Sequence, residues 1–173
     1  LVPAADVFEQ ISATRTEACG TTNMKYGFNG ALSVMSRSGS NIEIIDRIGE
    51  ENVIAFGATE EQLPSQGAYR PSEIIAASDQ LKAVFALLEG VLVKSPGGSA
   101  INPLIATLRD SDEYHVLLDY ADYVTKQEMV DALYQNRTRW LTTSLHTIAR
   151  LGWFSSDRLV AEYARDIWKI NPA

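Results

Sequence analysis

Short apolar segments alternate with helix-like segments in the first third of the chain. The segments 31–35 and 53–56 are short and apolar, which is typical of buried strands. A helix is expected at 21–30, with a threonine as its N-cap, and a second at 41–48. Strands joined in this order by helices pair in parallel, so the pattern predicts an α/β fold.

The beginning of the chain is harder to assign. Residues 1–3 are expected to be the tail of a buried strand, and 6–11 a turn or short helix. In the second expected helix, Ile42, Ile45 and Ile48 recur at helical spacing and are predicted to face the core.

The later part of the chain is expected to be mainly helical. The expected helices span 72–89, 103–109, 123–134, 138–151 and 158–168. The chain is accordingly divided into an α/β part (1–57), a variable part of helices and loops (58–111) and a helical tail (112–173). Within the tail, 117–122 is expected to be short and partly buried.

The last expected helix has a packing pattern of its own. Leu159, Tyr163, Ile167 and Trp168 are predicted to form its packing face. Arg158 and Glu162, four residues apart, are predicted to pair.

Charge and cysteine content exclude several classes of function. The formal net charge of −7 argues against a nucleic-acid partner, because neutralising many phosphates needs a basic face. The single cysteine excludes an internal disulfide, and no Cys/His cluster has metal-ligand spacing, so no metal site is expected. No apolar run approaches membrane-spanning length and 1–6 lack a basic region, so a cytoplasmic protein with no membrane partner is expected.

A polar turn containing a glycine lies directly before the first expected helix. Gly20 lets the backbone approach a ligand, while Thr21, Thr22 and Asn23 place hydrogen-bond donors at the helix start. The positive end of the helix favours a phosphate there. Lys25 follows one turn later, where its amine can hold an aldehyde cofactor as a Schiff base. Helix chemistry alone favours a solvated surface lysine at this position.

Four segments resemble one family. They are Thr16 to Leu32, Gly49 to Gly57, Asp119 to Val124 with Gln127, and Phe154 to Trp168. In this order they closely resemble segments of the α-glucan phosphorylases, which comprise the glycogen, starch and maltodextrin phosphorylases. The resemblance spans the chain and is weakest at 59–111.

The resemblance implies a fold and a cofactor. It implies part of the Rossmann-like C-terminal domain of a two-domain, GT-B type glycosyltransferase, followed by a helical C-terminal tail. It also implies pyridoxal 5′-phosphate, with the Schiff base on Lys25 and the 5′-phosphate cradled by Gly20, Thr21 and Thr22. In this family the Schiff base anchors the cofactor, and the cofactor phosphate acts as the general acid and base.

The resemblance further implies a reaction and its substrates. Glu17, Cys19 and Gly20 would bind the hydroxyls of the glucosyl unit. The complete enzyme would release glucose 1-phosphate from the ends of an α-1,4-glucan, using inorganic phosphate, and would be a homodimer. Leu1 is expected to be a cut point inside a longer chain. The remainder of that phosphorylase chain supplies further contacts, so this chain alone is expected to be inactive.

Some positions differ from the family pattern, and alternatives stay open. Cys19 stands where serine is usual, Thr22 where glycine is usual, Arg15 where a small residue is usual, and Arg37-Ser38 where the pair usually ends in aspartate. These differences are compatible with a divergent active branch and with a copy that has lost function. The main alternative is a non-catalytic fragment or split subunit that binds a partner. A second is another pyridoxal-phosphate enzyme that uses its lysine for amino-acid chemistry.

Overall fold

The computed structural model describes residues 1–12, 20–65 and 68–170. The chain forms two compact units. One combines Leu1–Phe56 with Lys126–Ala173 and contains a β-sheet, and the other, Gly57–Thr125, is helical.

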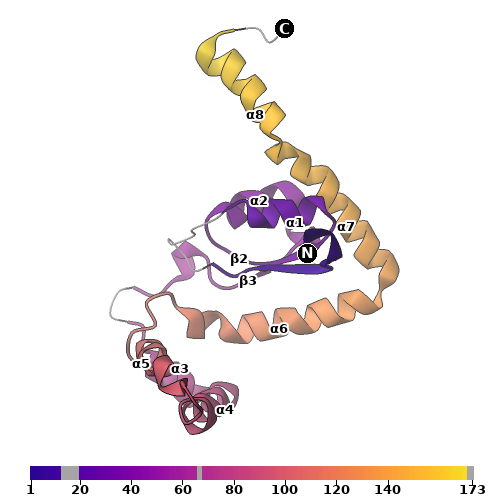
Figure 1. The fold of residues 1–173 in the computed structure, drawn as a ribbon. Helices are drawn as coiled ribbons and strands as arrows, with labels where there is room; N and C mark the ends of the chain where they lie inside the picture. The colour runs from indigo at the N-terminus through magenta and orange to yellow at the C-terminus, as the bar shows by residue number, and fades with distance from the viewer. Residues whose placement is uncertain (13–19, 66–67, 171–173) are drawn as a thin grey trace. The chain divides into compact units, whose positions relative to one another are not determined.

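The sheet of the first unit has three parallel strands (Figure 1). The strands are β1 (Val7–Gln10), β2 (Leu32–Ser36) and β3 (Ile54–Phe56). They lie in the order β1-β2-β3, so β2 is central and is buried along its whole length. The predicted α/β fold with parallel pairing is therefore confirmed.

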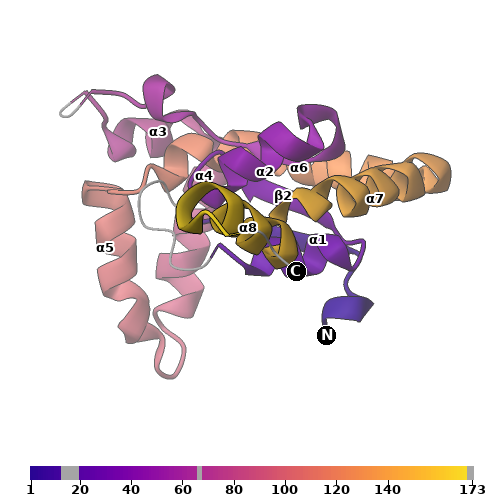
Figure 2. The ribbon, with the colours of Figure 1, turned by 90° about the horizontal axis from the view of Figure 1, so that it is seen from above.

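Helices cover both faces of this sheet. α1 (Thr22–Phe28) connects β1 to β2 and α2 (Ser40–Ile48) connects β2 to β3, and both lie on the same face (Figure 1). α7 (Arg137–Leu151) packs on α1 and α2 (Figure 2). The second half of α6 (Val116–Gln135) lies along the opposite face.

The core of the first unit lies between the sheet and these helices. It contains Met35, Ile44, Ile45, Ile48, Ala55 and Leu151. The prediction that Ile42 faces the core is wrong, because its side chain is 49% exposed and Ile44 is buried instead. The buried stripe runs through Asn41, Ile44, Ile45 and Ile48, which is the i, i+3, i+4, i+7 pattern of one helix face. This stripe begins with a polar residue, so an apolar pattern alone misplaces it.

The prediction for the beginning of the chain is wrong. Residues 7–10 form β1 where a turn or short helix was expected, and Val2–Ala4 is a short 3-10 helix instead of a strand tail. The reason is pairing with β2, in which Val7 lies opposite Leu32 and Gln10 opposite Met35.

The second unit is built around a separate apolar cluster. Its helices are α3 (Pro71–Ala77), α4 (Asp79–Leu87), α5 (Asn102–Asp110) and the first half of α6. Leu81, Phe85, Ile105 and Leu117 form the buried cluster. The single helix expected at 72–89 is interrupted at Ser78, whose side chain accepts a hydrogen bond from the Leu81 N–H at 3.2 Å and so caps α4.

One buried carboxylate organises the start of α6. Asp112 accepts hydrogen bonds from the N–H groups of Val116 (3.0 Å) and Leu117 (2.8 Å), and from the Tyr69 hydroxyl. Burial of the Tyr69 hydroxyl and the neighbouring Asp112 carboxylate together raise the pKa of this hydroxyl far above its ordinary value. The segment 117–122 is thus part of a long helix, not the short element expected.

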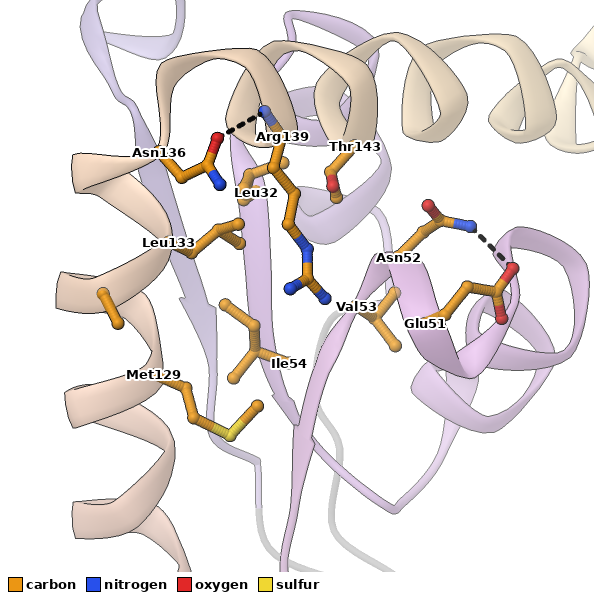
Figure 3. Close-up of a pocket in the computed structure, with 11 residues that line it drawn as sticks. Leu32, Glu51, Asn52, Val53, Ile54, Met129, Leu133, Asn136, Arg139 and Thr143 are labelled. Atoms are coloured by element: carbon orange, nitrogen blue, oxygen red, sulfur yellow. Dashed lines mark hydrogen bonds between the residues drawn. The ribbon is translucent and has the colours of Figure 1, made fainter.

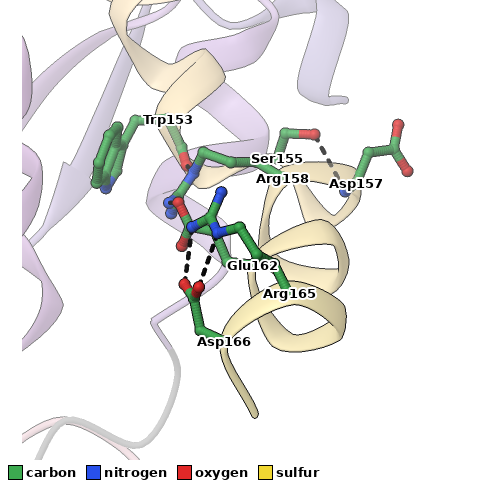
Figure 4. A network of polar contacts seen from close by, with 7 residues as sticks. All are labelled: Trp153, Ser155, Asp157, Arg158, Glu162, Arg165 and Asp166. Carbon is green, nitrogen blue, oxygen red and sulfur yellow. Dashed lines mark hydrogen bonds and ion pairs between the residues drawn. The ribbon is translucent and has the colours of Figure 1, made fainter. Parts of the chain in front are cut away.

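The chain returns to the first unit and ends in α8 (Ser156–Glu162), extended by a π-helical segment over Tyr163–Trp168. Arg158 pairs with Glu162 at 2.5 Å, as predicted (Figure 4). Two guanidinium groups stack on the Trp153 ring. Arg47 Cζ lies 3.6 Å and Arg158 Cζ lies 3.9 Å from the centre of the ring. These contacts connect α2 to the start of α8.

The packing face predicted for the last helix is exposed. Ile167 is 63% exposed, and Leu159, Tyr163 and Trp168 are exposed as well. Tyr163 and Trp168 contact each other edge to face. These four side chains lie on the C-terminal helical segment as expected, but none of them is buried, so the predicted packing is not found.

Candidate functional site

The carboxyl ends of β1 and β2 meet the starts of α1 and α2 at one edge of the sheet. This is the edge at which parallel α/β sheets place phosphate and cofactor sites. The turn that the sequence singled out leads into α1 here, and the described part of it begins at Gly20.

Two buried asparagines connect the starts of the two helices. Asn23 Nδ2 donates to Asn41 Oδ1 at 2.9 Å and to Ser40 Oγ at 3.1 Å. Asn41 Nδ2 donates to the Ser36 carbonyl oxygen at 2.9 Å, at the end of β2. Asn23 and Asn41 are 1% and 0% exposed, so breaking this bridge would leave buried polar groups without partners.

Serine hydroxyls extend the polar network towards β1. Ser36 Oγ donates to the Ser12 carbonyl oxygen at 2.7 Å, and Ser38 Oγ donates to the same oxygen at 3.0 Å. The two hydroxyl oxygens are 3.1 Å apart. The network therefore fixes the chain just after β1 relative to the end of β2. Ser38, at one of the unusual positions, takes part in it.

Gly20 lies against the first residue of α2. A Cβ atom at this position would be 3.0 Å from Ser40 Oγ and 3.1 Å from Ser40 Cβ, which is closer than ordinary contact. The missing side chain thus lets the turn before α1 approach α2 closely.

The remaining described candidates lie on the first two turns of α1. Thr21 is the N-cap residue, but its φ and ψ of −105° and −19° are helical, and its side chain does not cap the helix. Thr22 follows as the first helical residue. Lys25 is exposed, and within the described part of the chain no acidic side chain pairs with its amine. Its neighbour Tyr26 stacks on Phe8 of β1, with ring centres 4.7 Å apart, which fixes this part of α1 on the sheet.

The structure therefore brings Gly20, Thr21, Thr22 and Lys25 onto one turn and the helix that follows it. Glu17 and Cys19 lie outside the described residues. Sequence reasoning missed Asn41 and Ser36 as parts of this site. The sequence did contain a signal for Asn41, because an asparagine in the first turn of a helix that directly follows a buried strand is placed at the carboxyl end of the sheet.

The departure at Arg37 has a local partner. Arg37 forms an ion pair with Glu50, and its hydrogen bonds lower the pKa of the Glu50 carboxyl below its ordinary value. Arg37 follows β2 directly and Glu50 follows α2, so the ion pair connects the end of β2 to the segment before β3.

Residues 1–12, 20–65 and 68–170 offer neither a metal-binding cluster nor a membrane-spanning helix. No group of three or more His, Cys, Asp or Glu side chains in these ranges could hold a metal ion. None of the helices described has both the length and the apolar character needed to cross a membrane.

Comparison with known proteins assigns the chain to a family. The family model described as carbohydrate phosphorylase matches residues 1–170. The chain is 38% identical to glycogen phosphorylase of Pasteurella multocida over 174 aligned residues, which cover 99% of this chain and 21% of the relative. It is also 38% identical to the muscle form of human glycogen phosphorylase, with 100% of this chain and 21% of the relative covered.

A third relative agrees with these two. Glycogen phosphorylase of Bacillus subtilis is 38% identical over 99% of this chain and 22% of the relative. The chain thus spans about a fifth of the length of the curated relatives it matches. Because the family match covers nearly the whole sequence, the chain belongs to the carbohydrate phosphorylase family.

Proposed function

We propose that the chain is the cofactor-binding part of a pyridoxal-phosphate-dependent α-1,4-glucan phosphorylase. The observation that supports this most directly is the exposed side chain of Lys25, one turn inside α1. The turn that precedes this helix contains Gly20, which lies in close contact with Ser40 of α2. In the proposed enzyme, residues 1–173 belong to the Rossmann-like C-terminal domain of a two-domain, GT-B type glycosyltransferase. The parts 1–57, 58–111 and 112–173 would be its cofactor-binding segment, variable segment and helical tail.

The described residues fit the cofactor. The Lys25 amine is exposed and would bind the cofactor aldehyde covalently. The first turn of α1 leaves backbone N–H groups without acceptors inside the helix, and Thr21 and Thr22 are the first residues of that turn. Gly20 provides close backbone approach. These groups would hold the 5′-phosphate, whose general acid and base chemistry is what the cofactor supplies when bound.

The asparagine bridge would serve this site by positioning. Asn23 and Asn41 make no proposed contact with substrate. They fix the start of α1 relative to α2, which keeps the phosphate-binding turn and Lys25 in one arrangement. Preorganised donors stabilise charge without reorganising during the reaction.

The proposed substrates are an α-1,4-glucan and inorganic phosphate, since the relatives are named glycogen phosphorylases. Glu17, Cys19 and Gly20 are proposed to bind the glucosyl unit. The remainder of the phosphorylase chain is the proposed partner within a cytoplasmic homodimer, and the 173 residues alone are proposed to lack phosphorolysis.

A borohydride trap tests the proposal without requiring turnover. The chain is incubated with pyridoxal phosphate, reduced and digested, and the peptides are analysed by mass spectrometry. A phosphopyridoxyl group on the Lys25 peptide is expected, and Lys25→Arg should abolish it. Lys94→Arg is the matched control, because Lys94 is an exposed lysine of the other unit and its loss should leave the labelling of Lys25 unchanged.

Labelling that is scattered over many lysines, or absent from Lys25, would contradict a cofactor site in this chain. Such a result would favour the second candidate function, which is non-catalytic binding of a partner that carries the other domains. The exposed apolar face of Leu159, Tyr163, Ile167 and Trp168 supports that candidate. If labelling succeeds, adding the remaining phosphorylase domains and assaying glucose 1-phosphate release tests the full activity.

A further inference from the structure

A pocket lies at the amino-terminal ends of β2 and β3, at the sheet edge opposite the candidate cofactor site (Figure 3). Its volume is about 270 Å³. At roughly 30 Å³ per water in the liquid, this is the space of about nine waters, so it suits a ligand of about ten non-hydrogen atoms. All of its lining residues belong to the first unit.

One side of the pocket is apolar. Leu32 and Ile54 contribute the first residues of their strands, and both are buried. Val53 precedes β3, while Met129 and Leu133 reach the pocket from α6. This surface suits the hydrocarbon part of a ligand.

The other side offers hydrogen-bond donors from the start of α7. The Arg139 side chain extends into the pocket (Figure 3), and no described residue accepts a hydrogen bond from its guanidinium. Thr143 is only 8% exposed and also lines the pocket, and its hydroxyl has no partner among the described residues. Asn136 Oδ1 accepts from the Arg139 N–H at 3.1 Å, which leaves its Nδ2 as a third donor.

One acidic residue, Glu51, lines the pocket and accepts a hydrogen bond from a neighbouring side chain. Glu51 Oε1 accepts a hydrogen bond from Asn52 Nδ2 at 2.9 Å, and its carboxylate lies beside Gly49. No ion pair joins Glu51 to Arg139 among the described residues. Glu51 and Arg139 therefore both line the pocket without an ion pair among the described residues, and the Arg139 guanidinium is the charged donor that an anionic ligand can reach.

We propose that this pocket binds a small amphipathic carboxylate. Its apolar body would lie on Leu32, Ile54 and Met129. Its two oxygens would accept hydrogen bonds from the fork of the Arg139 guanidinium, a geometry that suits carboxylates. Thr143 would donate to the same head group. The proposal is independent of the cofactor, because no residue of the pocket belongs to the Gly20–Lys25 turn.

Calorimetric titration of the whole chain with phenylacetate tests this proposal. Phenylacetamide has the same body without the charge, acetate has the head without the body, and phenyl phosphate carries the other common oxyanion. Phenylacetate should bind at least roughly tenfold more tightly than the first two. It should also bind more tightly than phenyl phosphate.

Variants then assign the binding to this pocket. Arg139→Ala should weaken phenylacetate binding by at least roughly tenfold, and Thr143→Val, which keeps the shape, by a few-fold. Arg137→Ala is the matched control: Arg137 is exposed on the same turn of α7, does not line the pocket, and should leave binding unchanged. Circular dichroism checks that each variant is folded. Equal binding of phenylacetate and phenylacetamide, unchanged binding in Arg139→Ala, tighter binding of phenyl phosphate, or no binding of phenylacetate would each overturn the proposal.

Discussion

Replacing Gly27 by alanine tests how closely α1 packs on α7. Gly27 is buried, and a Cβ atom there would lie 2.3 Å from Leu151 Cδ1 and 3.4 Å from Thr147 Cγ2. Carbon atoms in good contact are about 3.5–4.0 Å apart, so the Leu151 side chain must move by more than about 1 Å. Leu151 is 1% exposed and lies in the core, which leaves it little room to move.

The expected cost follows from two opposing effects. Overpacking of a core costs about 1–3 kcal/mol, while alanine is favoured over glycine inside a helix by about 1 kcal/mol. The difference between the two effects is about 0–2 kcal/mol, so we expect Gly27→Ala to lower the free energy of unfolding by up to about 2 kcal/mol. Leu151→Ala should cost about 2–5 kcal/mol, since it removes a fully buried side chain.

The double variant distinguishes a direct clash from two independent effects. With Leu151 shortened, the new methyl group at residue 27 no longer meets Cδ1 and fills part of the cavity. The double variant should therefore be less destabilised than the sum of the single variants by about 1 kcal/mol or more. Urea unfolding followed by far-UV circular dichroism gives these free energies by linear extrapolation.

Gly90→Ala is the matched control, because Gly90 is helical and a Cβ atom there would meet nothing within 4 Å. It should be neutral or stabilising by up to about 1 kcal/mol. Additivity of Gly27→Ala and Leu151→Ala within about 0.5 kcal/mol would refute the packing argument, and so would an equal response of the two glycines.

Two further predictions concern charged groups. Burial raises the pKa of the Asp119 carboxyl above its value in the unfolded chain. The stability that this group contributes is therefore present below the unfolded pKa and declines as the pH rises from about 4 through the folded pKa. Asp119→Asn keeps an oxygen that accepts from the Ala58 N–H, and it should flatten that part of a profile of melting temperature against pH. An unchanged profile would contradict the assignment. Trp153→Leu removes the ring between Arg47 and Arg158 and should lower the free energy of unfolding by about 1–2 kcal/mol in urea titrations, with no loss expected if the stacked guanidiniums contribute nothing.

The sequence predicted the elements with strong local patterns. β2 and β3 are short apolar runs between turn residues, and α2 carries isoleucines at helical spacing, so their types followed from residues close in the chain. β1 was missed because its sequence, Val-Phe-Glu-Gln, has no clear alternation, and its extended form depends on pairing with β2 more than 20 residues away. The break at Ser78 was missed because apolar spacing continues across it, while the cap is a single hydrogen bond.

The candidate site was predictable to a similar extent. A glycine turn followed by a helix with a lysine is a local feature, and the structure has that helix at the carboxyl edge of the sheet. The choice of Asn41 as the partner of Asn23 depends on where two helices meet in space, which residue spacing does not specify.

The position of Lys25 is determined by contacts at both ends of α1. At its start, the Asn23–Asn41 bridge is buried, so moving α1 away from α2 would leave buried amide groups without their hydrogen-bond partners. At its end, Gly27 packs on α7, and the Gly30 carbonyl oxygen accepts a hydrogen bond from Ser144 Oγ at 2.7 Å. A helix this short has little stability of its own. Its orientation on the sheet therefore depends on these two tertiary contacts, and a substitution at either end would disturb the lysine without touching it.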